Sequence, residues 1–492
     1  MNALLVVENT RRWPLKLGGA QSVSAREYLV GSEWDERRGL RVYNFCRTYG
    51  YQTLGYYVSL LAAARGHRPI PTVETLQDLR LAPVVRLVSE QLEDRIQRDL
   101  APLKGPRFDL SIYFGRNLAR RYDALARALH DQFPVPLLRA SFEREGRAWR
   151  LASVRPIATS EIPDPHLDFV IEQAEAHFGR RPRAASSPRS FRYDLAILAA
   201  PEAPDAPSDE KALRRFVRAA REMGINAKQI HRRDAGSIAE FDALFLREAT
   251  YVDHPTYRLA RRAASEGLVV IDDPISILRC TNKVFQAELF KRHGIPHPLT
   301  VVAHNGNAEA IASTVGLPCV LKRPDSSFSR GVVRVESREQ LRAQLGEFLR
   351  DSELVVAQAY TPSLFDWRIG VLGGAPLYAC RYHMARGHWQ VVATGANGRR
   401  RYGRVEALPL DEAPRGAVEI AVRAASLIGD GLYGVDVKEK NGGFLVMEVN
   451  DNPNIDAGFE DAVLGDRLYL AVMDWFRQRL DARGLEQRCD GA

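Results

Sequence analysis

The stretch GLYGVDVKEKNGGFLVMEVNDNPNI, residues 431–455, decides the fold. The runs GVDVKEK and FLVMEVN flank the Asn-Gly-Gly at residues 441–443, and this pattern predicts a β-hairpin. Asp436 lies on one strand, while Glu448 and Asn450 lie on the facing strand, where residues two apart share a face. Burying acids in such apolar strands is costly unless a cation compensates, and Mg²⁺ accepts carboxylate and amide oxygens together with phosphate. The hairpin therefore predicts a magnesium site, with a purely structural hairpin as the alternative.

A polar loop lies upstream of the hairpin, in LPCVLKRPDSSFSRGVVRVES at residues 317–337. The segment predicts a strand that ends at Lys322, then a small polar loop closed by glycine, then a second strand. Such a loop can fold over phosphates with its N–H groups and hydroxyls, while a nearby lysine supplies charge. A polar hairpin with a surface lysine is the alternative. The candidate phosphate-binding residues of the loop are Ser326, Ser327, Ser329, Arg330 and Gly331.

Two arginines follow in ELVVAQAYTPSLFDWRIGVLGGAPLYACRYHM, residues 353–384, which predicts three strands. Asp366 and Arg368 are two residues apart and share a face, and Arg381 lies on the next strand. Arginines on neighbouring strands can neutralise a transferring phosphate or a substrate carboxylate. Salt bridging at a sheet edge is the alternative.

The chain divides at GRRPRAASSPRSF, residues 179–191, which is rich in Pro, Ser, Ala and Arg and predicts a linker. Strands and amphipathic helices alternate over residues 1–178, which predicts an α/β domain. Residues 192–272 predict a small doubly wound parallel layer. Longer strands of antiparallel character follow over residues 273–480.

The composition excludes a disordered or fibrous protein, because 45% of the 492 residues are hydrophobic and 26% are charged. The 69 Lys and Arg against 61 Asp and Glu give a net charge of +8, a mild excess that suits anionic small substrates, so nucleic acid is not expected. Five scattered cysteines without a CxxC pair predict a reducing, cytoplasmic setting. No apolar run approaches the ~18 residues of a membrane span, so no membrane partner is expected.

These segments together resemble the ATP-grasp superfamily, in the family's order across residues 273–460. The run DWRIGVLGG with its following arginine is similar to the RimK-like branch. RVYNFCRTYGYQTLGYYVSLLAAARGHRPIP, starting at residue 41, is similar to the extra N-terminal domain of some RimK-like proteins. The resemblance implies an α/β chain with an ATP-grasp fold, preceded by a small Rossmann-like domain and an additional N-terminal α/β domain. Its carriers are Lys283, in a predicted helix from about Asn282 to Gly294, together with Lys322, Gln358, Arg368 and the acidic hairpin.

The resemblance also implies a reaction. Such enzymes use ATP to phosphorylate a carboxylate, and an amine then displaces phosphate from the acyl phosphate to leave an amide or peptide bond. The implied cofactors are ATP and one or two Mg²⁺, two being favoured, with Mn²⁺ as an alternative. The implied substrate is an amino acid, a peptide or a protein terminus, and a homo-oligomer is an open alternative.

Residue roles carry over from the resemblance position by position. Lys283 and Lys322 would contact ATP phosphates, and Arg368 and Arg381 would steady the γ-phosphate or acyl phosphate. The segment beside adenine would be Gln358, Ala359 and Tyr360, and Asp366 would serve the ribose end or hold Arg368. The Mg²⁺ ligands would be Asp436, Glu448 and Asn450, with Glu448 bridging.

One segment departs from the family pattern. Residues 385–406, ARGHWQVVATGANGRRRYGRVE, lack the short Asn-Leu-His-Arg run of the RimK relatives, so glutamate transfer to a ribosomal protein is not carried over. This basic run is a candidate for holding an anionic substrate, with a solvated loop as the alternative. An ATP-binding regulatory or scaffold protein with a decayed ligase site remains the alternative function.

Overall fold

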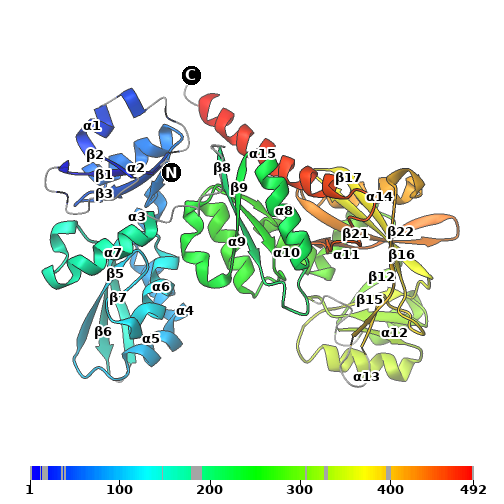
Figure 1. Ribbon diagram of the computed structural model, residues 1–492. Coiled ribbons are helices and arrows are strands. Elements are labelled where there is room, and N and C mark those ends of the chain that lie inside the picture. Colours follow the sequence, from blue (N-terminus) through cyan, green and yellow to red (C-terminus); the bar gives the residue numbers. More distant parts are fainter. Residues whose placement is uncertain are drawn as a thin grey trace. The chain divides into compact units, whose positions relative to one another are not determined.

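The structure, a computed structural model, shows a mixed α/β chain (Figure 1). It forms two compact units. Unit 1 comprises residues 1–193, 233–241 and 481–492, and unit 2 comprises residues 194–232 and 242–480. The structure describes residues 3–10, 13, 20–30, 32–34, 37, 40–146, 148–178, 191–304, 307–325, 331–394 and 400–489.

Unit 1 contains two sheets. The first is parallel, in the order β2-β1-β3-β4, and β1 is buried along its whole length, as is typical of parallel strands covered on both faces. The second is antiparallel, in the order β5-β6-β7. The strands are β1 (Ala3–Val7), β2 (Gln21–Ser24), β3 (Arg41–Phe45), β4 (Arg68–Ile70), β5 (Arg107–Tyr113), β6 (Leu137–Glu145) and β7 (Ala148–Pro156).

Seven helices accompany these sheets in the described part of unit 1. Leucines, valines and aromatic residues from them fill the cores beside the strands. The helices are α1 (Ala25–Val30), α2 (Leu54–Ala64), α3 (Val73–Asp78), α4 (Ala82–Gln91), α5 (Glu93–Leu100), α6 (Asp123–Gln132) and α7 (Leu167–Phe178).

Unit 2 begins with a four-stranded sheet in the order β11-β10-β8-β9, in which β10 runs parallel to both β8 and β11. All five residues of β10 are buried, because continuous apolar strands are covered on both faces. The elements are β8 (Tyr193–Ala199), α8 (Glu210–Glu222), β9 (Ile225–Ile230), β10 (Ala243–Arg247), α9 (Pro255–Ser265) and β11 (Val269–Ile271).

The rest of unit 2 contains two larger antiparallel sheets and one two-stranded antiparallel sheet. The smaller of the two larger sheets has the order β12-β15-β13-β14. It is preceded by α10 (Pro274–Thr281) and α11 (Lys283–Arg292), and its elements are β12 (Thr300–Ala303), α12 (Ala308–Thr314), β13 (Cys319–Lys322), β14 (Val332–Val335), α13 (Arg338–Phe348) and β15 (Val355–Ala359). The start of α11 follows from Asn282, whose side chain accepts hydrogen bonds from the first free N–H groups of the helix.

The larger sheet has the order β20-β17-β16-β21-β22, and α14 packs on one of its faces. Its hairpin turns where the sequence predicts, because Asn441 and Gly442 both adopt positive φ, as a two-residue turn of this kind requires. The elements from residue 365 onward are β16 (Phe365–Leu372), β17 (Ala375–His383), β18 (Val392–Thr394), β19 (Arg400–Tyr402), β20 (Val405–Leu408), α14 (Arg415–Ser426), β21 (Leu432–Lys440), β22 (Gly443–Asp451) and α15 (Asp466–Cys489). Of these, β18 and β19 pair with each other as the separate two-stranded sheet.

The α/β fold class is confirmed. The boundaries at residues 178, 191 and 272 remain predictions, and residues 179–190 of the expected linker lie outside the described residues. Among the described residues, no helix has the length and apolar composition needed to cross a membrane.

Candidate active site

The larger antiparallel sheet places most of the predicted site residues on one face. Paired residues of neighbouring antiparallel strands share a face, and Arg368 pairs with Asp436, which pairs with Glu448. Asn450 pairs with Gly434 and lies on the same face. We call this the polar face. The opposite face of the sheet is apolar and packs against α14.

A β-bulge in the hairpin creates the polar face. Val437 pairs with Val446, whereas the preceding Asp436 pairs with Glu448, so Met447 is an extra residue of β22. A bulge of this kind shifts the register by one residue and so changes which side chains share a face. Without it, Asp436 would pair with Met447, and Glu448 would project from the apolar face.

Arg368 and Asp436 form a bidentate ion pair at the centre of the polar face. The Arg368 Nε lies 2.5 Å from the Asp436 Oδ1, and the Nη2 lies 2.9 Å from the Oδ2. Burial raises the pKa of the Asp436 carboxyl, and Arg368 opposes that shift. Gly434 leaves room for the pair, since a Cβ at this position would lie 3.0 Å from the Arg368 Cδ and 2.8 Å from the Cβ of Pro453. The pair therefore holds the Arg368 guanidinium in a fixed orientation.

Two lysines from other elements lie around Glu448. The Nζ of Lys283, in the first turn of α11, is 3.7 Å from the Glu448 Oε2. Lys322, at the end of β13, is buried, and burial lowers its pKa to about 8 although Glu448 works in the opposite direction. Burial also acts to raise the pKa of Glu448, but Lys283, Lys322 and Arg368 outweigh burial and hold this pKa below its ordinary value. Glu448 is therefore a charged carboxylate between cations.

Asp366 is paired with Lys438, and its expected place at the ribose end stays a prediction. Its carboxylate forms an ion pair with the Nζ of Lys438, and its Oδ1 accepts a hydrogen bond of 2.9 Å from the Ser363 hydroxyl. In the described part of the chain, Asp366 therefore holds Lys438 and not Arg368.

The predicted adenine segment ends the strand β15. The Gln358 side chain is buried and donates from its Nε2 to the Thr300 Oγ1 at 3.0 Å. The Ala359 N–H donates to the carbonyl oxygen of Leu299 at 2.8 Å. Because this N–H is already bonded, Ala359 has only its carbonyl to offer a nucleotide.

Tyr360, the residue after β15, contacts two residues that are distant from it in the sequence. The Arg334 guanidinium lies 4.4 Å from the centre of its ring, and the Trp389 ring meets it edge-on at 5.8 Å.

The predicted phosphate loop is described only at its two ends. Gly331, at the second end, has a φ of +63°, so a glycine is required at this position. Ser326, Ser327, Ser329 and Arg330 lie outside the described residues, and their roles stay predictions.

Arg381 requires a correction, because it does not share the polar face with Arg368. Arg381 pairs with Trp367, whereas Arg368 pairs with Cys380, so the two arginines project from opposite faces. The Arg381 guanidinium lies 4.9 Å from the ring centre of Trp367, and its Nη1 is 4.0 Å from the Oε2 of Glu406. The expectation that the two arginines act on one phosphate is therefore wrong.

Lys438 is a polar-face residue that sequence reasoning missed. It is buried and lies two residues after Asp436 on β21, so the period of two could have placed it on the same face. Tyr382 and Glu460 were missed as well, and a contact between β17 and the loop after β22 has no signal in the sequence.

Asp436, Glu448 and Asn450 suit a magnesium ion. They offer carboxylate and amide oxygens on one face, and hard oxygen ligands of this kind, completed by water and phosphate, are those that Mg²⁺ takes. In the described part of the chain, no cluster of three His, Cys, Asp or Glu side chains is poised for a metal. The set is thus an incomplete one that a nucleotide phosphate would complete.

Two family models match the sequence. Residues 25–173 match the RimK-like ATP-grasp N-terminal domain, and residues 280–463 match the RimK-like ATP-grasp domain. The chain therefore belongs to the RimK-like ATP-grasp family, and the predicted family and ligase class are confirmed.

Two named relatives are similar to the chain in sequence, and one solved structure is similar to it in fold. The chain is 30% identical over 196 residues to the alpha-aminoadipate–LysW ligase LysX of Saccharolobus solfataricus, covering 38% of this chain and 67% of that protein. It is 28% identical over 249 residues to a probable alpha-L-glutamate ligase of Shewanella denitrificans, covering 50% of this chain and 81% of the relative. A RimK domain ATP-grasp protein from Sphaerobacter thermophilus has a similar structure, with a TM-score of 0.45, 19% identity, and coverage of 57% of this chain and 98% of that one.

Proposed function

We propose that this protein is an ATP- and Mg²⁺-dependent ligase that joins the carboxylate of one substrate to the amine of another through an acyl phosphate. The observation that carries the proposal is the polar face, where an oxygen ligand set, the locked Arg368 and two lysines converge around Glu448. Amino acids and peptides are the proposed substrates, in keeping with the names of the relatives.

The reaction has two balanced steps. A carboxylate oxygen of the first substrate attacks the γ-phosphorus of ATP, and ADP leaves with the bond electrons. The amine nitrogen of the second substrate then attacks the acyl carbon, phosphate leaves, and the nitrogen loses a proton. Neither step needs a protein nucleophile, so catalysis rests on positioning and charge neutralisation.

The chain's own residues supply those two effects. Lys283 and Lys322 bind phosphate oxygens, and Arg368 presents its Nη1, for which the described residues offer no hydrogen-bond acceptor. Asp436, Glu448 and Asn450 would hold Mg²⁺, which when bound neutralises phosphate charge. We propose two ions, with Glu448 bridging them.

The test is a product search with the whole chain. The protein is incubated with ATP, Mg²⁺, the 20 protein amino acids and a random pentapeptide library, and ADP and new amides are measured. We expect ADP release that depends on the mixture, with a product whose mass equals the sum of two components minus water. ATP binding without ADP release above background would contradict the ligase proposal.

Nucleotide affinity should fall at alkaline pH. The pKa of Lys322 is lowered to about 8 by burial, so its charge is lost on raising the pH through that value, and a deprotonated amine cannot attract phosphate. We expect the Kd for ATP to be constant near pH 7 and to rise up to about tenfold per pH unit above 8. Isothermal titration calorimetry from pH 7 to 9.5 measures it.

The control for this profile is Lys322→Met, which removes the titrating group. The variant should bind ATP more weakly at pH 7 and show a flatter dependence of Kd on pH above 8. A profile as steep as that of the wild type would assign the effect to another group.

A further inference from the structure

The loop of residues 452–465, which we call the anchored loop, follows β22 directly and precedes α15. It begins two residues after Asn450, so it leaves the polar face at the end where the metal ligands lie. It is fixed on one side to α8 and on the other to β17. The proposed function does not account for its contacts.

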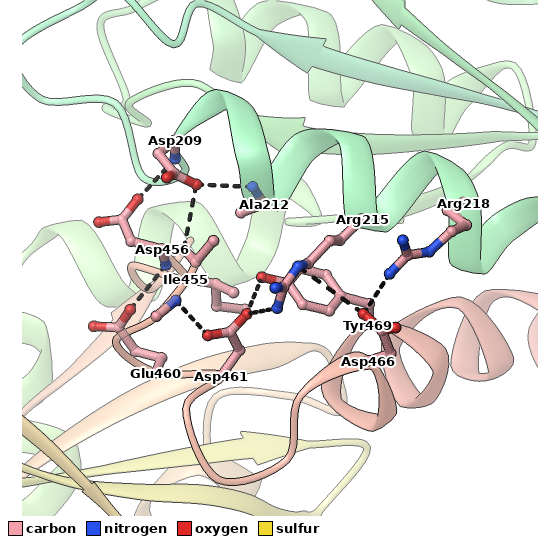
Figure 2. Close-up of polar contacts among 12 residues, drawn as sticks. Asp209, Ala212, Arg215, Arg218, Ile455, Asp456, Glu460, Asp461, Asp466 and Tyr469 are labelled. Atoms are coloured by element: carbon pink, nitrogen blue, oxygen red, sulfur yellow. Dashed lines mark hydrogen bonds and ion pairs between the residues drawn. The ribbon is translucent and has the colours of Figure 1, made fainter.

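Figure 2 shows the contacts to α8. The Asp209 N–H donates to the Asp456 Oδ1 at 2.7 Å, and the Asp209 Oδ1 accepts from the Ala457 N–H at 3.2 Å. Asp461, which is 1% exposed, forms an ion pair with Arg215. These bonds hold one side of the loop to α8.

Two tyrosines of β17 contact the loop: the Tyr378 hydroxyl donates to the Asn454 carbonyl oxygen at 3.4 Å, and Tyr382 contacts Glu460. The Tyr382 hydroxyl donates to the Glu460 Oε1 at 2.5 Å, and the Glu460 Oε2 accepts from the Asp456 N–H at 2.8 Å. Glu460 is only 3% exposed. The Arg368 guanidinium lies 4.7 Å from the centre of the Tyr382 ring. One continuous path of contacts therefore runs from Asp436 through Arg368 and Tyr382 to the anchored loop.

The path has two parts with different structural roles, the Arg368–Asp436 ion pair and the Tyr382–Glu460 hydrogen bond. Arg368 is already held by both oxygens of Asp436, so its orientation does not depend on the Tyr382 hydroxyl. The hydroxyl bond instead joins Glu460 of the anchored loop to the ring that lies over Arg368. The loop brings the half-buried carboxylate of Asp456, which would attract an amine and repel a carboxylate.

Resting on the proposed function, we propose that Tyr382 and Glu460 are positioning residues for the second step. They hold the anchored loop against Arg368, so that the amine bound beside the loop meets the acyl carbon. Reacting atoms must approach to about 3–3.5 Å with correct alignment, so a loop free to move would slow this step and leave phosphate transfer intact.

The test compares two amines in the Tyr382→Phe variant, which keeps the ring over Arg368 and loses the hydroxyl. Hydroxylamine, a small amine used at high concentration, attacks the acyl carbon without needing a binding site that orients it. The attack releases phosphate and gives a hydroxamate. With ATP, Mg²⁺ and the amino acid and peptide mixture, we expect hydroxamate formation within about twofold of wild type and amide formation about tenfold lower. The KM for ATP should not change.

Glu460→Gln should likewise lose amide formation and keep hydroxamate formation. The glutamine amide would point an N–H donor at one of the two donors, the Tyr382 hydroxyl and the Asp456 N–H, that now point at Glu460. The Tyr382→Phe/Glu460→Gln double variant should be no worse than either single variant, since both remove one interaction. The matched control is Tyr433→Phe, which removes a buried hydroxyl that contacts Ser276 from the apolar face of the same sheet. This control variant should show no difference between its effects on amide formation and on hydroxamate formation.

Two results would overturn the inference. In one, Tyr382→Phe forms amide and hydroxamate at wild-type rates. In the other, both products fall together with a changed KM for ATP, as a merely structural role would produce. If the wild type forms neither product, the proposed function itself fails, which separates that failure from failure of the inference alone.

Discussion

Replacing Glu448 with glutamine should reduce ATP-dependent amide formation about 10²–10³-fold at saturating ATP. Glu448 is the carboxylate of the polar face that lies among cations, and its pKa is held low by Lys283, Lys322 and Arg368. A neutral amide is a much poorer magnesium ligand, and the lysines lose their counter-charge. Steady-state ADP release and product mass spectrometry measure the effect.

The matched control is Glu439→Gln, which removes an exposed carboxylate of the same hairpin away from the polar face pairing. This variant should keep wild-type activity. A tenfold higher Mg²⁺ concentration should restore little of the activity lost in Glu448→Gln, because the variant lacks the charged oxygen ligand itself. Activity of Glu448→Gln within tenfold of wild type would remove Glu448 from the metal site.

Replacing Arg368 with leucine should destabilise the protein by about 3–5 kcal/mol, because it leaves Asp436 buried without its counter-charge. The two side chains are 11% and 16% exposed, so water can replace little of the lost interaction. The Arg368→Leu/Asp436→Leu double variant should regain most of that stability, since removing both charges also removes the cost of burying them. Both variants should be inactive. The urea midpoint followed by circular dichroism measures the stability.

The comparison for this pair is Arg415→Ala, which breaks an ion pair with Glu419 on α14 in which Arg415 is 92% exposed. Exposed pairs of this kind contribute little, so the urea midpoint should not move. If Arg368→Leu and the double variant were equally destabilised, the loss would come from packing and not from the unpaired charge.

Local sequence signals predicted much of the fold, because they act over a few residues. Asn-Gly between apolar strands requires the turn at residues 441–442, and both residues adopt positive φ there. Asn282 caps α11, and the side-chain amide oxygen reaches the N–H groups of the next turn in any context. The sequence places Lys322 at the end of a strand beside the polar loop, whereas the role of Lys283 is implied by the family resemblance.

The faces of the larger sheet could not be predicted in this way, because each depends on one extra residue. Between β16 and β17, Val371 pairs with Pro376 but Gly370 pairs with Tyr378, so Leu377 of β17 is an extra residue and this bulge shifts the register. Without this bulge Arg381 would pair with Asp366 and join the polar face.

The sequence by itself determined the elements, the hairpin, the family and the types of residue that bind phosphate and magnesium. Only the tertiary structure decided which of them meet. One bulge brings Glu448 onto the face of Asp436, another turns Arg381 away, and the anchored loop joins β17 through Glu460. Register and long-range contacts depend on packing across the whole sheet, which no local pattern of residues encodes.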